Sequence, residues 1–319
     1  MDPTSAPDGQ NAARLYDTAP PSAPRPGLRA LKAGLADTAS GLLLPAIKRL
    51  APDHVGGETL DEALAVAQAL AGRGLANTLG FWDTPAYAPE QVAHVYRQAI
   101  ARIGEAGADG YVSIKPPALR FDSAVAHELA RAAREAGVRL HCDSHGIQVA
   151  DLTLAFASEL ARELPPHLIS VTTHGRWSRS LADANRLLER GVGVRIVKGE
   201  WPDPDDAARN MRQGFLDLAE GVAGAQAHVA IASHDAALSA EAISRLRQAG
   251  TPCELELIHG LQTETLLRAA CEAGVATRIY VPFGRGFVPS ALRILGRNPG
   301  LAIRVLTSVI TPWRATARA

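Results

Sequence analysis

The stretch NRLLERGVGVRIVKGEW, residues 185–201, contains the unit from which the fold of this chain can be predicted. It starts in a segment with helical composition, passes through Gly191, and continues as a short run rich in β-branched residues that ends at Lys198. A glycine in this place is typical of the left-handed residue that ends a helix before the chain enters a sheet. We therefore interpret the stretch as a helix followed directly by a strand.

The same unit recurs along the chain. Strands are expected at 75–79, 111–114, 138–142, 168–173, 193–197, 229–232, 253–258 and 279–281. Helices are expected between them, for example at 89–103, 123–136, 151–163, 181–189, 205–220, 236–248 and 263–273, and four of these precede Gly137, Gly191, Gly250 or Gly274. Eight strand–helix units over about 240 residues match an α/β fold of the (β/α)8 TIM-barrel type.

A doubly wound open sheet is the alternative fold. It is disfavoured because no G-x-G-x-x-G follows the first expected strand, and no G-x-x-x-x-G-K-[ST] occurs in the sequence.

The N-terminal part of the chain has a different composition. Residues 1–26 are rich in Pro, Ala and Ser and predict a flexible tail, because such a segment buries too little apolar surface to offset its ordering entropy. Apolar residues at steps of three and four predict helices within 28–50 and 58–70. We therefore expect a tail over 1–26 and one barrel domain with an N-terminal helical extension over 27–319. The apolar run 301–310 is expected to be a helix that closes the barrel, with a quinone or membrane surface as the alternative.

The composition argues against several functional classes. The chain has 319 residues with 33 basic and 33 acidic side chains, and a net charge of zero provides no field that would attract nucleic acid. Three cysteines are too few for a disulfide framework or a zinc ribbon, which favours a reducing compartment. No apolar run is long enough to span a membrane, and the N-terminus lacks the order of a secretory signal. We expect a cytoplasmic protein, with peripheral contact at the inner membrane face as the alternative.

Polar side chains gather where the expected strands end, which is where a (β/α)8 barrel carries its chemistry. The set is Lys115, His141, Asp143, His145, Thr173, His174, Arg195, Lys198, Ser233, His234, Asp235, His259 and Tyr280. A barrel with structural needs alone would carry such residues at one or two strand ends, whereas here they follow most of the strands. The pattern indicates a functional site.

Two chemistries could use this set. In the first, His141 and Asp143 share one face of a strand and, with other histidines of the set, hold a divalent ion in a metal-dependent hydrolase. The adjacent His pair that such a site usually has at the first strand is replaced by Gly-Phe-Trp at 80–82. In the second, Lys115, Arg195 and Lys198 bind an anionic cofactor, since they place cations at strand ends.

Residues 194–199, VRIVKG, closely resemble the R-[LI]-V-K-G strand of the proline dehydrogenase family, whose members are FAD-dependent (β/α)8 barrels. Other landmarks follow in the family's order. VSIK at 112–115 resembles S-[IV]-K, LHCD at 140–143 occupies the place of a strand ending in D-A-E, and ASHD at 232–235 resembles A-T-H-N. ELELIHGL at 254–261 resembles E-F-Q-x-L-[YH]-G-M, YVPFG at 280–284 matches Y-[VA]-P-[YFV]-G, and RILGRNP at 293–299 stands where the family has R-R-L-x-E-N-P.

The resemblance implies an FAD-dependent flavoprotein of amino-acid metabolism. Such an enzyme oxidises proline, or a related secondary-amine, imino or N-substituted amino acid, to an imine by hydride transfer to flavin N5. By position, the residues implied in cofactor binding are His174, Arg195, Val197, Lys198, Gly199, Trp201, Ser233 and His234. Those implied in catalysis and substrate binding are Lys115 and Asp143 as an acid–base pair, Tyr280 over the substrate, and Arg293 at its carboxylate. The electrons would pass to a quinone or another acceptor, and a homo-oligomer is compatible with the sequence.

Departures from the family's motifs fall on the substrate side. The second clamp arginine is Ile294, and Arg297, four residues after Arg293, could supply a second fork from the same helical face. An Arg–carboxylate contact is worth about 1.5–3 kcal/mol, so its loss would weaken proline binding roughly ten- to hundredfold. The expected Tyr is Ser290, and the D-A-E acid is His145. These changes predict a retained flavin site and leave the substrate open between proline and a relative such as another imino acid, an N-substituted amino acid or a hydrazine-type acid. A barrel that has lost its chemistry is the remaining alternative.

Overall fold

The computed structural model of the protein describes residues 56–84, 86–107, 109–261 and 263–287. The predicted tail, the helix expected within 28–50, the C-terminal run 301–310, and Arg293 and Arg297 lie outside the described residues.

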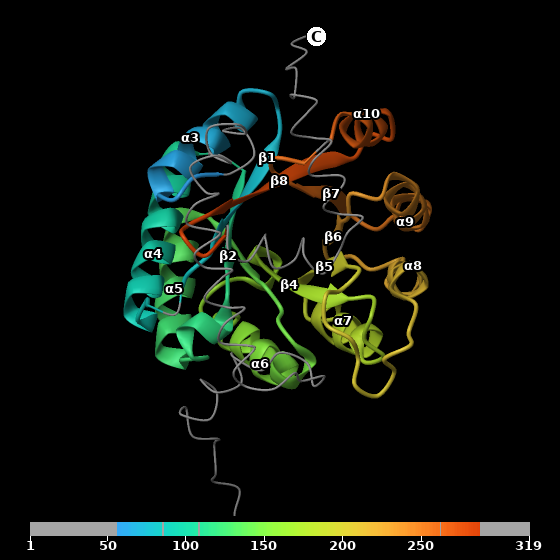
Figure 1. The fold of residues 1–319 in the computed structure, drawn as a ribbon, viewed down its shortest axis with the longest axis horizontal. Coiled ribbons are helices and arrows are strands. Elements are labelled where there is room, and N and C mark those ends of the chain that lie inside the picture. Colours follow the sequence, from blue (N-terminus) through green and yellow to red (C-terminus); the bar gives the residue numbers. More distant parts are fainter. Residues whose placement is uncertain (1–55, 85, 108, 262, 288–319) are drawn as a thin grey trace, which may run out of the picture.

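Eight parallel strands form a closed barrel in chain order, surrounded by helices (Figure 1). The strands are β1 (Ala76–Phe81), β2 (Gly110–Ile114), β3 (Arg139–Cys142), β4 (Ile169–His174), β5 (Gly193–Val197), β6 (Val229–Ala232), β7 (Cys253–Ile258) and β8 (Ala276–Phe283). The α-helices described are α3 (Leu60–Ala71), α4 (Pro89–Ala106), α5 (Ser123–Ala136), α6 (Ala150–Leu160), α7 (Ser180–Leu188), α8 (Met211–Gly221), α9 (Ala236–Gln248) and α10 (Glu264–Glu272). Because β1 pairs with both β2 and β8, the predicted (β/α)8 barrel is confirmed.

Short 3-10 turns lie in the loops: η2 (Pro116–Leu119) after β2, η3 (Ile147–Val149) before α6, and η4 (Pro166–Leu168) before β4. None of the helices among the described residues is long and apolar enough to cross a membrane.

Helix α5 shows why the repeated unit folds as it does. The side chain of Asp122 accepts hydrogen bonds from two backbone N–H groups of the first turn, which would otherwise have no partner. Leu129 and three alanines form the buried face, and burial of one leucine side chain contributes about 1.5–3 kcal/mol. The helix ends at Gly137, whose φ of +66° is the left-handed conformation that the sequence predicts. Positive φ values confirm the other three predicted glycine stops, Gly191, Gly250 and Gly274.

The expected helix at 205–220 begins later than predicted, at Met211. Asn210 caps it by accepting hydrogen bonds from two backbone N–H groups of the first turn. The preceding residues form a loop around Asp203, whose fully buried carboxylate accepts from the backbone N–H and the hydroxyl of Ser178, both at 2.7 Å, and from Asp205 N at 3.0 Å. These bonds tie the loop after β5 to the loop after β4.

Outward-facing strand residues form the apolar core beneath the helices. Val194 and Ile196 of β5 and Leu140 and Cys142 of β3 are fully buried in this layer. Burial raises the pKa of the Cys142 thiol, which makes it an unreactive part of the core.

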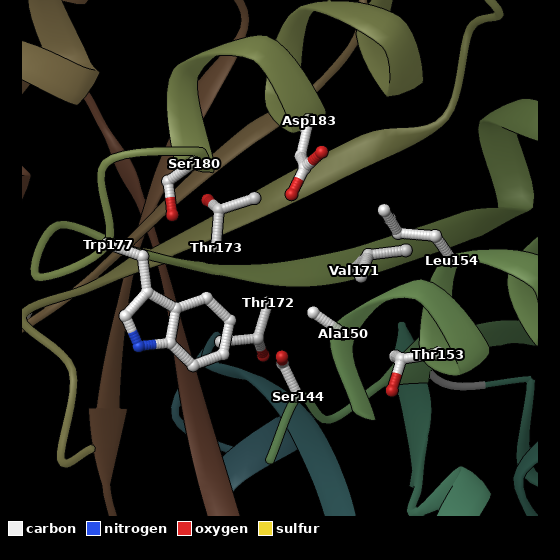
Figure 2. Close-up of a pocket in the computed structure, with 10 residues that line it drawn as sticks. All are labelled: Ser144, Ala150, Thr153, Leu154, Val171, Thr172, Thr173, Trp177, Ser180 and Asp183. Carbon is white, nitrogen blue, oxygen red and sulfur yellow. The ribbon is translucent and has the colours of Figure 1, made fainter. Parts of the chain in front are cut away.

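A small cavity lies between β4 and the helices α6 and α7 (Figure 2). Its volume of about 20 Å³ is enough for about one water molecule. Hydroxyl groups of Ser144, Thr172, Thr173 and Ser180 and the indole of Trp177 line it. We interpret it as a hydration site behind the barrel wall, because it is too small for a substrate.

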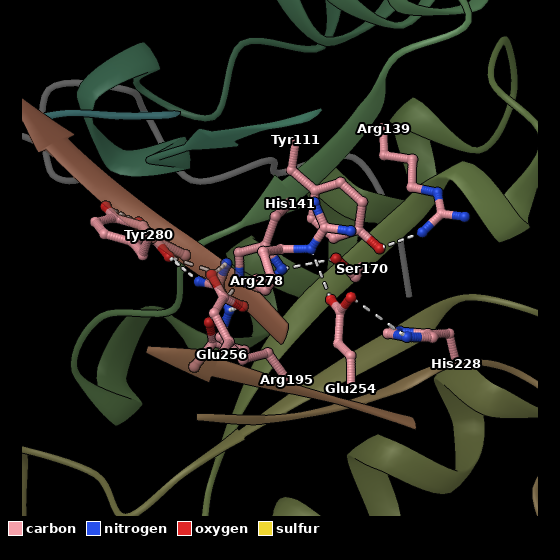
Figure 3. Close-up of polar contacts among 12 residues, drawn as sticks. Tyr111, Arg139, His141, Ser170, Arg195, His228, Glu254, Glu256, Arg278 and Tyr280 are labelled. Atoms are coloured by element: carbon pink, nitrogen blue, oxygen red, sulfur yellow. Dashed lines mark hydrogen bonds and ion pairs between the residues drawn. The ribbon is translucent and has the colours of Figure 1, made fainter. Parts of the chain in front are cut away.

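Branched apolar residues commonly fill the inside of a barrel of this fold. In this protein the inside of the barrel is polar instead. Alternate strand residues point inward, and charged side chains from several strands meet there (Figure 3). At the N-terminal end of the strands, Arg278 donates to Glu254 Oε1 at 2.8 Å and lies over the ring of Tyr111, 3.7 Å from its centroid. Arg139 donates to the hydroxyl of Tyr111 at 2.5 Å. A second group of charges lies above these, at the C-terminal end.

Candidate active site

The C-terminal end of the barrel brings together five ionisable side chains from five strands. Lys115 follows β2, Asp143 follows β3, Arg195 lies in β5, Glu256 in β7 and Tyr280 in β8. Neighbouring strands of a barrel end on the same rim, so residues far apart in sequence become neighbours. The sequence predicted four of these residues for the site, and Glu256 is an addition.

Asp143 is the centre of this group. Its Oδ1 atom accepts a hydrogen bond from Arg195 Nη1 at 3.0 Å, and its Oδ2 atom lies 3.7 Å from Lys115 Nζ. The hydroxyl of Tyr280 donates to Oδ2 at 3.4 Å. Burial disfavours the charged carboxylate, but the positive charges of Lys115 and Arg195 outweigh burial and lower its pKa to about 2. Asp143 is therefore a carboxylate at neutral pH.

Lys115 is buried, with 5% of its surface exposed, and is held in place by two neighbours in addition to Asp143. Its Nζ atom donates to the carbonyl oxygen of Phe81 at 2.5 Å and lies 4.8 Å from the ring centroid of Trp82. Burial lowers the pKa of Lys115, although the charges of Asp143 and Asp83 oppose the shift. A lysine in this setting can exchange a proton more readily than one in water.

Arg195 is held by two carboxylates. Its Nε and Nη2 atoms donate to the two oxygens of Glu256 at 2.7 and 2.8 Å, a bidentate pair, while Nη1 donates to Asp143. The guanidinium carbon lies 5.6 Å from the ring centroid of Tyr280. Burial opposes the charge, but Glu256 and Asp143 outweigh it and raise the pKa of Arg195. Burial raises the pKa of Tyr280 well above its usual value, which keeps its hydroxyl protonated as a donor.

His141 lies one layer below Asp143 inside the barrel. Its Nδ1 atom contacts the hydroxyl of Ser170 and its Nε2 atom that of Thr172, both at 2.7 Å. Burial and the charge of Arg195 lower the pKa of His141 well below its usual value, so the ring is neutral. We interpret it as a support for the Asp143 carboxylate, whose Oδ1 is 3.6 Å from His141 Nε2.

The loops after β4 and β5 form a second part of the candidate site. His174 is 2% exposed and stacks on Trp177, with ring centroids 3.9 Å apart and planes at 26°. Neither ring nitrogen of His174 has a hydrogen-bond partner among the described residues. Burial lowers the pKa of His174 to about 3, which makes a neutral imidazole with one donor and one acceptor. The indole of Trp177 in turn donates to the carbonyl of Trp201 at 3.1 Å.

Gly199 occupies a position where a side chain would be strained and tightly packed. Its φ is +98°, and an added Cβ would lie 3.1 Å from Arg176 Cβ and 3.2 Å from both Cβ and Nδ1 of His174. The adjoining Val197 and Lys198 are partly buried at the end of β5. Glycine here permits the tight approach of the backbone to His174.

The predicted residues after β6 lie beside β7. Ser233 is buried, and its hydroxyl accepts from Asp235 N at 3.2 Å. His234 Nε2 accepts from Ile258 N at 2.8 Å, which fixes its ring against the end of β7. Asp235 caps α9 and pairs with Arg212 of α8.

The candidate site thus combines the predicted residues Lys115, Asp143, Arg195 and Tyr280 at its centre, with His174 at the end of β4 and Gly199 and Trp201 in the loop after β5. For the metal-dependent alternative, no group of three or more His, Cys, Asp or Glu side chains that could hold a metal ion occurs in the part of the chain that the structure describes.

Glu256 was missed because a barrel interior is expected to be apolar. The alternation Glu-Leu-Glu-Leu at 254–257 is the signal that could have identified it, since it places Glu254 and Glu256 on one face of a strand. The Gln of the family's E-F-Q-x-L motif falls at the position of Glu256.

Comparison with known proteins gives a consistent set of relatives. No family model matches the chain. A proline dehydrogenase from Deinococcus radiodurans is 24% identical over 281 residues, which is 82% of this chain and 90% of the relative. Proline dehydrogenase 1 from Bacillus subtilis subsp. natto is 22% identical over 276 residues, or 80% of this chain and 89% of the relative. The predicted resemblance to proline dehydrogenases is therefore confirmed over about four-fifths of the chain.

Solved structures show the same fold. Proline utilization A from Bdellovibrio bacteriovorus, inactivated by N-propargylglycine, superposes with a TM-score of 0.65 at 20% identity over 81% of this chain. A variant of proline utilization A from Bradyrhizobium japonicum gives a TM-score of 0.65 at 19% identity, also over 81%. This chain spans about a third of those longer chains, 33% and 32% respectively.

Proposed function

We propose that this protein is an FAD-dependent dehydrogenase that oxidises the CH–NH group of proline or of a related imino or N-substituted amino acid. The observation that carries the proposal is the group formed by Lys115, Asp143, Arg195 and Tyr280 at the C-terminal end of the barrel. It occurs in a chain whose relatives are named proline dehydrogenases.

Three features fit a flavin cofactor. The buried His174 imidazole offers both ring nitrogens to a polar ligand. Gly199 lets the backbone come close, in a place where a Cβ would crowd His174 and strain a φ of +98°. Of the five N–H groups of a guanidinium, Asp143 and Glu256 occupy three on Arg195, which leaves two for a ligand. Further positions in our proposal for holding FAD are Val197, Lys198, Trp201, Ser233 and His234.

FAD, when bound, supplies an electron-accepting N5 atom that takes up a hydride. The protein's own side chains prepare the substrate for that step. An amino acid arrives with a protonated nitrogen, and its lone pair must be freed before hydride can leave the adjacent carbon. In our proposal Lys115 Nζ accepts the proton from the substrate nitrogen, because burial lowers its pKa and so makes its neutral form easier to reach.

Asp143 stays ionised throughout. Loss of hydride from the neutral amine leaves an iminium, which carries one positive charge, and the Asp143 carboxylate stabilises that charge. The same carboxylate also stabilises the protonated form of Lys115, because Asp143 Oδ2 lies 3.7 Å from Lys115 Nζ. Tyr280, oriented by its hydrogen bond to Asp143, packs over the substrate in this proposal.

The substrate carboxylate is assigned to Arg293, with Arg297 as a second contact. Because Ile294 replaces the family's second clamp arginine and Ser290 replaces its tyrosine, we propose a relative of proline rather than proline itself as the preferred substrate.

The test is spectroscopic. Purified protein should be yellow or take up FAD, and an anaerobic screen should identify the substrate as the compound that bleaches the flavin absorbance. The screen should include L-proline, six-membered cyclic imino acids and N-methyl amino acids. The matched control is Asp143→Asn, which should bind FAD and show bleaching slowed at least a hundredfold. A colourless protein that takes up no added FAD would refute the proposed function.

A further inference from the structure

Glu256 has a buried carboxylate whose chemistry the proposed hydride transfer does not use. Only 3% of its surface is exposed, and both oxygens are bound to Arg195, at 2.7 and 2.8 Å. Figure 3 shows the two side chains next to each other inside the barrel, near Tyr280. The following inference rests on the proposed function, because it concerns the flavin that Arg195 would face.

The formal charges of the four central residues of the site cancel. Lys115 and Arg195 are the cations of the group, and Asp143 and Glu256 are the anions. Asp143 is shared between both cations, whereas Glu256 contacts Arg195 alone among the ion pairs at this end. Without Glu256 the group would carry one net positive charge among side chains that are mostly buried.

A net positive charge beside a flavin favours its reduced form, because reduction adds electrons and creates negative charge on the ring. A carboxylate in direct contact with the cation removes most of that effect. We propose that Glu256 is a positioning residue that orients the Arg195 guanidinium and, by compensating its charge, lowers the reduction potential of the bound flavin.

A purely structural role for the pair predicts something else. A buried ion pair can hold two strands together without influencing a ligand, and replacement of one partner would then change stability alone. The midpoint potential of the flavin separates the two roles, because it compares oxidised and reduced forms of one folded protein.

The experiment replaces Glu256 by Gln in the full chain, a change that keeps the shape and removes the charge. The control is Glu254→Gln, since Glu254 is two residues earlier on the same face of β7 but pairs with Arg278 at the opposite end of the barrel. Potentials are measured by equilibration with reference dyes, without substrate. Glu256→Gln should shift the reduction equilibrium at least tenfold toward reduced flavin, a rise of about 30 mV for a two-electron couple. Glu254→Gln should change it less than threefold.

Four further results bear on the inference. Glu256→Asp, which retains the charge, should stay within threefold of the unmodified protein, and a shift as large as that of Glu256→Gln would assign the effect to packing and overturn the inference. An unchanged or lowered potential in Glu256→Gln would also overturn it, with the proposed function intact. If that variant does not fold, Glu256→Ser, which leaves room for water, carries the same expectation. A protein that binds no flavin would remove the proposed function together with this inference.

Discussion

Replacement of Arg278 by Met should destabilise the barrel by about 3–5 kcal/mol, the cost of leaving a buried charge without its partner. The guanidinium of Arg278 is fully buried and donates to Glu254 Oε1 at 2.8 Å, to the carbonyl of Asn77 at 2.8 Å, and to the Asp109 carboxylate at 3.0 Å. Met would fill much of the same volume but satisfy none of these acceptors. Glu254, only 3% exposed, would then keep a charge in the barrel interior with His228 Nε2, 3.9 Å away, as its nearest basic group.

The assay is urea unfolding followed by circular dichroism, with thermal unfolding as a second measurement. With an m-value of about 1–3 kcal/mol/M, a loss of about 4 kcal/mol lowers the midpoint by more than about 1 M urea, and it lowers the melting temperature by about 10 °C. The double variant with Arg278→Met and Glu254→Leu should recover most of the lost stability, because removal of both charges leaves none uncompensated. Two results would refute the claim that the ion pairs inside the barrel stabilise the fold. One is a loss of unfolding free energy below about 1 kcal/mol for Arg278→Met, and the other is a double variant that is at least as unstable as the single one.

Three other predictions concern the candidate site. Gly199→Ala should weaken FAD binding at least tenfold in a titration while the chain still folds, because the added Cβ strains a φ of +98° and presses on His174 at 3.2 Å; unchanged affinity would show that this backbone does not adjoin the cofactor. The lowered pKa of Asp143, about 2, contributes about 2 kcal/mol of stability that is present above pH 4 and is lost as the pH falls toward 2. In Asp143→Asn the free energy of unfolding, measured from pH 5 to pH 2, should fall less steeply with decreasing pH. An equally steep fall in the variant would contradict the lowered pKa of Asp143. Arg293→Ala should abolish bleaching of the flavin by the true substrate, and intact turnover would mean that the substrate carboxylate binds elsewhere.

The barrel itself was predictable because its signal is repeated. Strand and helix alternate with a glycine stop between them, so a wrong boundary in one unit does not change the topology. The strands at 193–197, 229–232 and 253–258 were predicted to the residue. The start of α8 was not, because composition carries the helical pattern back to residue 205, whereas the capping side chain of Asn210 and the loop around Asp203 decide where the helix begins.

The candidate site was predictable in part for a different reason. Strand ends can be read from the sequence, and most of them carry polar residues that meet on a common rim, so Lys115, Asp143 and Tyr280 could be grouped without any structure. Which of these charged side chains pair with each other could not be predicted, because the pairing depends on the distances between side chains inside the barrel. The pairing of Arg195 with Glu256, at 2.7 Å, joins residues 61 positions apart on β5 and β7, which are not neighbouring strands.

The paired charges explain why the site should respond as a unit. Asp143 owes its low pKa to both Lys115 and Arg195, and the charge available on Arg195 is limited by Glu256. Neutralising Glu256 leaves Arg195 to Asp143 alone, which draws that carboxylate closer to the guanidinium and weakens its attraction for Lys115. The pKa of Lys115 would then fall. A change of charge at Glu256 on β7 would thus alter the proton affinity of Lys115, which follows β2, through the contacts of Arg195 and Asp143. The proton transfer and the electron transfer proposed for this barrel are therefore coupled through Asp143, and effects of single substitutions at these four residues should not add.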